Sequence, residues 1–167
     1  MDVLATLRAY AAAAAGGPPV LARTPAELAA AGAVASHFLA VTSSRSIALI
    51  GGDDSVQSLV AHRTWFSPRD IRCTSGSVAA AVEGRQVPLA EALAADIVCI
   101  HVPMALAASQ LRRGTHVNAL AMVELDDELK KLATIVDEAK GLPALAAGLV
   151  DGRQLDELTV FVTHREP

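Results

Sequence analysis

The stretch IALIGGDDSVQSLVAHRTW, residues 47 to 65, decides the fold. Its apolar run, Ile47-Ala48-Leu49-Ile50, reaches the glycines Gly51 and Gly52, and a helical pattern follows. A strand that enters a helix through glycines is typical of a dinucleotide-binding unit, in which the amides of the helix N-terminus receive a pyrophosphate. In this chain Asp53 and Asp54 stand where such a turn has a further glycine. The stretch therefore predicts the backbone shape of a nucleotide site, whereas its two aspartates argue against binding of a phosphate there.

Short apolar runs and helical patterns alternate on both sides of this stretch. The runs predict strands at 46–50, 70–74, 96–100, 115–120, 133–136 and 158–162. Helices are expected at 54–66, 89–94, 104–111, 126–131 and 142–149, with a weaker pattern at 77–83. This alternation favours an α/β fold, a doubly wound, mostly parallel sheet of Rossmann-like type. We expect the strand order 3-2-1-4-5-6, or a version without an edge strand, with residues 46–50 at its centre.

Two further helices precede the first strand. An alanine-rich helix is expected at 3–15, where it would cover apolar surface, and Gly16-Gly17-Pro18-Pro19 ends it. The second begins with Thr24 as N-cap, Pro25 in the first turn and Glu27 as the partner in a capping box. His37 on this helix is interpreted as a packed or surface histidine.

Composition bounds the class of protein. The chain has 167 residues, 52% of them hydrophobic, and a net charge of −4 without a basic block, which argues against nucleic acid as a partner. No run of 18 apolar residues predicts a membrane span. Asp2 and Arg8 give the N-terminus the wrong charge order for a signal peptide, so a cytoplasmic protein is expected.

The two cysteines are expected to be reduced and buried. Cys73 and Cys99 end predicted strands that another strand separates, which places them roughly 9–10 Å apart and too far for a disulfide. No ligand spacing joins them to His101 or His116, so no metal site is predicted.

From Arg23 onward the chain resembles the ornithine cyclodeaminase/μ-crystallin family. RTPAELAAAGAVASHFLA is similar to its RTxAxSALAxxxLA helix, and ALIGGDDSVQ stands where its GAGxQ turn is expected. LRRGTHVNALA, the most specific match, resembles LKPGTHVNAVG. ALAADIVCIHVP, ELDDELKKLATIVDEA and GRQLDELTVFVT are similar to GADIVxxATP, ELDxELxxxAxxVVD and GRxxxDEITVFxS. Each match is weak alone, but the six occur in the family's order.

The resemblance implies a Rossmann domain that binds NAD or NADP beside a substrate and dimerisation domain. Residues 23–167 would form the Rossmann domain, and residues 1–22 a helix and linker in place of the substrate domain. No counterpart is found for the family's basic residues that hold a substrate carboxylate. The positions carried over as vestigial cofactor-binding residues are Gly51, Gly52, Gln57, Thr74, Ser75, His101 and Asn118. For Gln57 and Asn118, buried hydrogen bonding is an equal alternative.

The resemblance to the family is weaker in the loop that carries the family's catalytic aspartate. The family's catalytic aspartate falls at Met122 or Val123, so no catalytic residue is assigned. Glu124 or Asp126 is a displaced alternative, but the preferred interpretation is an exposed Glu124 and an Asp126 that caps the next helix. Without an acid, proton transfer loses a contribution of about 10²- to 10⁴-fold.

The cofactor loop also departs from the family. Asp53 and Asp54 are expected to repel a pyrophosphate, and one of them to cap the helix from within. Ile100 and Val102 stand where relatives carry threonines, and CTSGS lacks an arginine for an NADP phosphate, although Ser77 and its neighbours offer hydroxyls. No cofactor is therefore expected, with NAD or NADP as the alternative.

The function predicted is a non-catalytic ligand-binding or protein-interaction module. The alternative is an NAD(P)-dependent amino-acid or imino-acid oxidoreductase, or a cyclodeaminase subunit, whose substrate domain comes from a separate chain. In the resembled family a substrate domain packs against the Rossmann domain, and replacing it by a short helix would leave apolar surface uncovered. A homodimer or a separate protein partner is therefore expected to cover this surface. A small-molecule ligand fits either interpretation.

Overall fold

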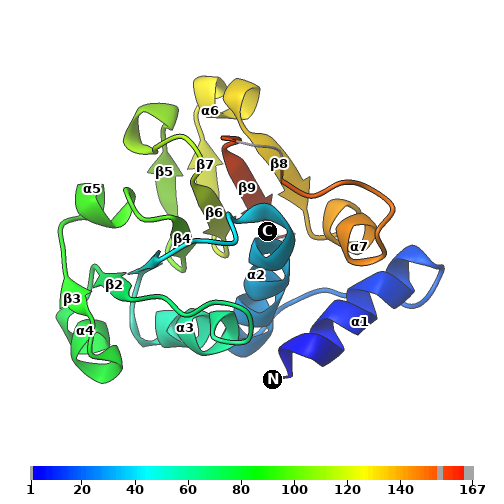
Figure 1. Cartoon of the computed structure of the whole chain (residues 1–167), viewed down its shortest axis with the longest axis horizontal. Coiled ribbons are helices and arrows are strands. Elements are labelled where there is room, and N and C mark those ends of the chain that lie inside the picture. The colour runs from blue at the N-terminus through cyan, green and yellow to red at the C-terminus, as the bar shows by residue number, and fades with distance from the viewer. Residues whose placement is uncertain (1, 154–155, 164–167) are drawn as a thin grey trace.

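The computed structural model describes residues 2–153 and 156–163 and confirms the α/β prediction. Seven strands form a parallel sheet in the order β3-β2-β1-β4-β6-β9-β8 (Figure 1). These strands are β1 (Ser46–Ile50), β2 (Asp70–Cys73), β3 (Arg85–Gln86), β4 (Ile97–Ile100), β6 (His116–Ala119), β8 (Thr134–Asp137) and β9 (Thr159–Val162). A second, two-stranded sheet joins β5 (Met104–Leu106) to β7 (Val123–Leu125).

Strand β1 is central, as predicted, because every one of its residues is buried. Ile47 and Leu49 pack on one face and Ala48 and Ile50 on the other, which only a strand covered on both sides permits. Its neighbours β2 and β4 place Cys73 and Cys99 opposite Leu49 from either side. Both thiols are buried and free, as expected.

The strand order differs from the prediction at one end of the sheet. The chain's last strand, β9, inserts between β6 and β8 instead of forming the edge. Burial explains this, because Val160 and Phe161 of β9 are fully buried. In β8, Thr134 and Ile135 are exposed. The short strand β3, which the sequence did not indicate, forms the opposite edge.

Helices cover both faces of the sheet. One face carries α2 (Pro25–Leu39), α3 (Val56–His62), α4 (Gly76–Val82) and α7 (Gly141–Ala146). The other carries α5 (Leu89–Ala92), α6 (Asp127–Leu132) and the small sheet. The weak helical pattern at 77–83 is confirmed by α4, and the capping box of Thr24 and Glu27 by α2.

The helix predicted at 104–111 is wrong. Residues Met104–Leu106 form β5, and a 3-10 turn at Ala108–Gln110 follows. The strand forms because its backbone pairs in parallel with Val123–Leu125, a partner some twenty residues further on. Such a long-range pairing overrides local preference and leaves no periodic signal in a short apolar segment.

The N-terminal helix α1 (Val3–Ala14) packs against α2 and α7 of its own chain, as Figure 1 shows. Asp2 caps it by accepting from the amides of Leu4 and Ala5. Tyr10, which is fully buried, donates its phenolic proton to Glu138 Oε1 at 2.7 Å. The prediction that this helix covers apolar surface is confirmed within the chain. No helix in the described ranges is long and apolar enough to cross a membrane.

Replacing Tyr10 by phenylalanine should lower the free energy of unfolding by about 1.5–3 kcal/mol, because a buried carboxylate loses a hydrogen-bond donor. Burial and the neighbouring Glu138 raise the pKa of Tyr10 well above its ordinary value, so the phenol remains a donor at any working pH. Urea unfolding measures the change. Thr6→Ala, which removes an exposed hydroxyl from the same helix, serves as the control. Equal effects of the two changes would contradict a special role for the Tyr10–Glu138 bond.

Candidate functional site

The glycine turn after β1 lies where the strand order reverses, because β2 flanks β1 on one side and β4 on the other. Ligands of doubly wound sheets bind at this position. Gly51 has φ +138°, and a Cβ there would lie 3.1 Å from His101 Cβ and 3.3 Å from Val102 Cγ1. Its amide donates to Thr74 Oγ1 at 3.3 Å. The turn therefore keeps the conformation and the close approach that require glycine.

The two aspartates lie in this turn without capping a helix. Asp53 and Asp54 begin a 3-10 turn, Asp53–Ser55, which runs into α3. Gly52 is the cap residue, and no side chain makes a capping hydrogen bond there. The prediction of an aspartate cap is wrong because the 3-10 turn places both acids inside the first turn instead of before it. Both carboxylates are exposed, and Asp53 Oδ1 accepts from Ser77 Oγ at 3.4 Å.

A hollow of about 650 Å³ opens beside the turn at the carboxyl ends of β1, β2 and β4. Its lining residues are Ile50, Thr74, Gln86, Val87, Pro88, Leu89, Val102 and Met104. Apolar side chains form the walls, and Thr74 and Gln86 supply polar groups. Volumes of roughly 300–1,000 Å³ with few polar groups are typical of small-molecule sites.

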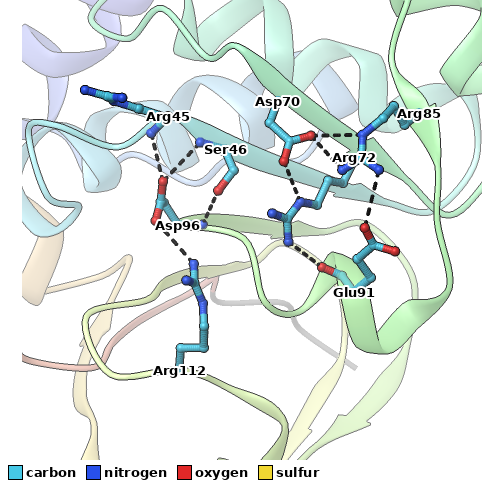
Figure 2. Close-up of polar contacts among 8 residues, drawn as sticks. All are labelled: Arg45, Ser46, Asp70, Arg72, Arg85, Glu91, Asp96 and Arg112. Atoms are coloured by element: carbon cyan, nitrogen blue, oxygen red, sulfur yellow. Dashed lines mark hydrogen bonds and ion pairs between the residues drawn. The ribbon is translucent and has the colours of Figure 1, made fainter.

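The arginines of the β2–β3 edge are engaged in ion pairs (Figure 2). Arg72 Nε lies 2.9 Å and Arg85 Nη2 lies 3.0 Å from the carboxylate of Asp70, and Arg85 Nη1 lies 3.3 Å from Glu91. Although partial burial opposes it, hydrogen bonds from the two arginines hold the pKa of Asp70 below its usual value. Figure 2 shows both guanidinium groups directed at these acids. They tie β3 and α5 to β2, and neither cation is left without a carboxylate.

The predicted site residues separate into three places. Thr74 and Ser75 follow β2, where Ser75 Oγ lies 2.9 Å from Ser77 Oγ. His101 follows β4, and its Nε2 lies 2.6 Å from Ser58 Oγ on α3. Gln57 is exposed on α3 and lines a separate hollow of about 300 Å³ between α1, α2 and α3. The structure thus brings the first three residues to the switch point and places Gln57 elsewhere.

Asn118 belongs to a buried polar network between the sheet and α2 and α3. His116 Nδ1 lies 2.8 Å from Thr159 Oγ1, and its Nε2 lies 2.8 Å from Asn118 Oδ1. Asn118 Nδ2 donates to Ser36 Oγ at 2.9 Å, and Ser36 Oγ lies 2.7 Å from His62 Nε2. All five residues are fully buried. For Asn118, the buried hydrogen-bonding alternative is the arrangement that the structure shows.

Burial shifts both histidines of this network toward neutrality. Desolvation lowers the pKa of His62 to about 4, against a hydrogen bond to the Ser58 carbonyl that opposes the shift. Desolvation also lowers the pKa of His116 to about 3. The sequence did not predict this network, although His116 and Asn118 are two residues apart on one strand and so share a face. Its partners on α2 and α3 left no signal in the sequence.

In the resembled family the loop before α6 carries the catalytic acid, but in this chain Met122 and Val123 occupy that position. Met122 is 62% exposed, and Val123 begins strand β7. Asp126 accepts from Leu129 N at 2.8 Å and caps α6, as predicted, and Glu124 is exposed on β7. Over residues 2–153 and 156–163, no cluster of histidine, cysteine and acidic residues could hold a metal ion.

Comparisons with known proteins find likeness in solved structures alone. No family model and no curated sequence matches the chain. An archaeal alanine dehydrogenase dimer with bound NAD is 24% identical with a TM-score of 0.71, over 82% of this chain and 57% of its own. The iminosuccinate reductase of Paracoccus denitrificans, in complex with NAD⁺, is 22% identical with a TM-score of 0.70, over 83% and 58%.

A probable ornithine cyclodeaminase from Bordetella pertussis Tohama I is 19% identical with a TM-score of 0.71, over 82% of this chain and 59% of its own. The chain thus spans less than two thirds of the length of each of these proteins. At such identities the likeness concerns the fold. The chain has the Rossmann-like α/β fold of these enzymes, the same group of proteins that its motifs resemble.

Proposed function

We propose that the chain is a non-catalytic, nucleoside-binding module of the ornithine cyclodeaminase/μ-crystallin family. The observation that carries the proposal is the apolar hollow at the switch point, which opens beside a glycine turn that bears two carboxylates. The hollow supports binding of a neutral, flat ligand group. The two carboxylates oppose binding of a negatively charged ligand group.

The adenosine half of a dinucleotide fits the residues present. Ile50, Val87 and Val102 offer apolar contact to a base, and Thr74 and Gln86 offer hydrogen-bonding groups. A hollow of about 650 Å³ is large enough for a nucleoside.

The pyrophosphate half does not fit. Asp53 and Asp54 occupy the first turn of the helix that would receive it, and both are exposed without a cation of the described chain paired to them. Two unit charges 4 Å apart interact by about 1 kcal/mol in water and about 4 kcal/mol at an effective dielectric of 20. The repulsion between each carboxylate and a phosphate is therefore a large fraction of the binding free energy of a weak ligand.

The proposal of a non-catalytic role rests on the loop before α6. Met122 and Val123 occupy the positions of the family's acid, and neither can transfer a proton. Asp126 is engaged as the cap of α6, where it accepts from Leu129 N. At the position of the family's acid this loop thus has no proton donor, and the displaced alternative, Glu124, is exposed on β7.

A second candidate is an NAD(P)-dependent oxidoreductase or cyclodeaminase subunit completed by a separate chain. It is favoured by Gly51, which retains the strained turn of a dinucleotide site, and by solved structures of the same fold that hold NAD. Both candidate functions are compatible with a homodimer or a separate protein partner. The alanine dehydrogenase of the same fold is described as a dimer. Light scattering of the purified chain, alone and with a candidate partner, tests that association.

Calorimetric titrations with adenosine, AMP and NADH separate the two candidates. We expect adenosine to bind more tightly than NADH, and Asp53→Asn with Asp54→Asn to raise NADH affinity about tenfold or more by removing the repulsion. Asp127→Asn with Glu128→Gln on α6 changes the net charge equally and is the matched control. Micromolar NADH binding by the unaltered chain would overturn the first candidate and favour the second.

A further inference from the structure

A small hollow opens at the amino ends of the strands, at the pole of the sheet opposite to the glycine turn. Its volume is about 190 Å³, and it lies where the chain enters β1, β4, β6 and β9. The lining residues are Val41, Ser43, Ser44, Asp96, Arg112, Arg113, Gly114, Thr115 and Asp156. Because sites for drug-sized molecules begin at roughly 300 Å³, this volume suits a small ion or a ligand of a few atoms.

Two neighbouring arginines supply positive charge to this hollow. Arg112 Nη2 donates to Asp96 Oδ1 at 3.3 Å, which engages one of the N–H groups of its guanidinium. Arg113 Nη2 lies 3.9 Å from Asp156 Oδ2, a distance beyond that of a hydrogen bond, and both side chains are largely exposed. Donor groups of both arginines therefore remain for a ligand that enters between them.

Asp96 is held by other donors and anchors Arg112. Its Oδ2 accepts from the amides of Arg45 and Ser46 at 2.8 and 3.0 Å, and its Oδ1 accepts from Arg112. Figure 2 shows Arg112 reaching the carboxylate from the side opposite to Arg45 and Ser46. Although partial burial opposes it, the two amide hydrogen bonds hold the pKa of Asp96 below its usual value. The carboxylate therefore stays charged and keeps Arg112 at the hollow.

A third arginine lies behind the wall of the hollow. Arg153 Nη2 donates to the Gly114 carbonyl at 3.0 Å, and its Nη1 donates to the Glu157 carbonyl at 2.7 Å. Its Nε donates to the Leu39 carbonyl. This cation is thus fixed by neutral oxygens, so its positive field adds to that of the two exposed arginines.

A buried hydroxyl at the hollow is left without a partner. Thr115 is 1% exposed, and its Oγ1 has no hydrogen-bond partner among the residues that the structure describes. Most buried hydroxyls are hydrogen-bonded, because an unpaired one loses its hydration without replacement. The turn that carries it is closed by the Thr115 amide, which donates to the Arg112 carbonyl at 3.3 Å, with φ +80° at Gly114. One turn therefore presents two guanidinium groups and an unsatisfied hydroxyl.

We propose that this hollow binds a small oxyanion, inorganic phosphate or the phosphate group of a small ester, through Arg112, Arg113 and Thr115. Guanidinium groups match the oxygens of a phosphate in geometry, and one phosphate accepts from several donors at once. The exposed hydroxyl of Ser43 adds a donor at the rim. Arg113 leaves Asp156 at little cost, since exposed ion pairs of this kind contribute little to stability. The site lies apart from the nucleoside hollow and does not depend on it.

Calorimetric titrations with inorganic phosphate and with glycerol 3-phosphate test the site. Sodium chloride keeps the ionic strength equal in every titration, because screening alone changes the interactions of exposed charges. We expect saturable binding of one ligand with a dissociation constant of about 1 mM or lower. The tighter of the two ligands identifies the free ion or the ester as the natural form. Absence of saturable binding for both ligands would overturn the proposal.

Three variants locate the binding. Arg113→Gln should weaken phosphate binding about tenfold or more, because a charge-assisted hydrogen bond is lost. Arg8→Gln, at an exposed position of α1, changes the net charge equally and is the matched control. Thr115→Val should weaken phosphate binding about threefold to tenfold, while its urea midpoint stays unchanged or rises because no unpaired hydroxyl is buried. Equal affinities of the two arginine variants, or full affinity in Thr115→Val, would overturn the proposal.

Discussion

Alanine in place of Gly51 is expected to lower the free energy of unfolding by about 2–4 kcal/mol. The backbone there has φ +138°, which costs a residue with a Cβ about 1–3 kcal/mol. The added atom would also lie 3.1 Å from His101 Cβ, so the turn and the end of β4 must move apart. Urea denaturation followed by circular dichroism measures the change.

Gly52→Ala is the matched control, one residue further along the same turn. Gly52 has φ −86°, and a Cβ there meets nothing within 4 Å, so the expected change is within about 0.5 kcal/mol. Similar losses for the two variants would show that the turn is not held by close approach to β4. Gly51→Ala should also abolish any nucleoside binding, because the displaced residues include Val102 of the hollow.

These two glycines show how far the sequence predicts the site. The order of apolar runs and glycines predicted the sheet, its central strand and the turn, because each depends on local pattern and burial on both faces. The aspartates beside them were predicted as a cap, yet a 3-10 turn put Gly52 in that position. A shift of one residue at a helix start is decided by backbone geometry that residue types do not determine.

Long-range partners account for what the sequence did not predict. Strand β5 exists because β7 pairs with it, and β9 lies inside the sheet because Phe161 is buried against α2. The network around Asn118 joins residues from β6, β9, α2 and α3, whose proximity is a product of the fold. Spacing along the chain carries no trace of such contacts, whereas the helix cap at Asp126 was predicted because it is local.

Acid should destabilise the protein through the two buried histidines before its carboxylates titrate. Their folded pKa values are lowered, to about 4 for His62 and about 3 for His116, against an ordinary value of 6.5. Below pH 6.5 the unfolded chain therefore binds more protons than the folded one. The stability that the neutral rings contribute is fully present above pH 6.5 and is lost as the pH falls toward these values.

Each histidine contributes a slope of at most about 1.4 kcal/mol per pH unit, so the free energy of unfolding should fall by about 2–2.7 kcal/mol per unit between pH 6 and pH 5. This window lies above the ordinary carboxylate pKa values, and urea titrations across it give the slope. His62→Gln should halve the slope whatever it does to stability at pH 7, since one of the two protons is removed. His37→Gln, which changes a partly exposed ring stacked on Trp65, should reduce the slope less. If the slope is unchanged in His62→Gln, the ring is already charged in the folded protein, and its burial as a neutral member of the network is contradicted.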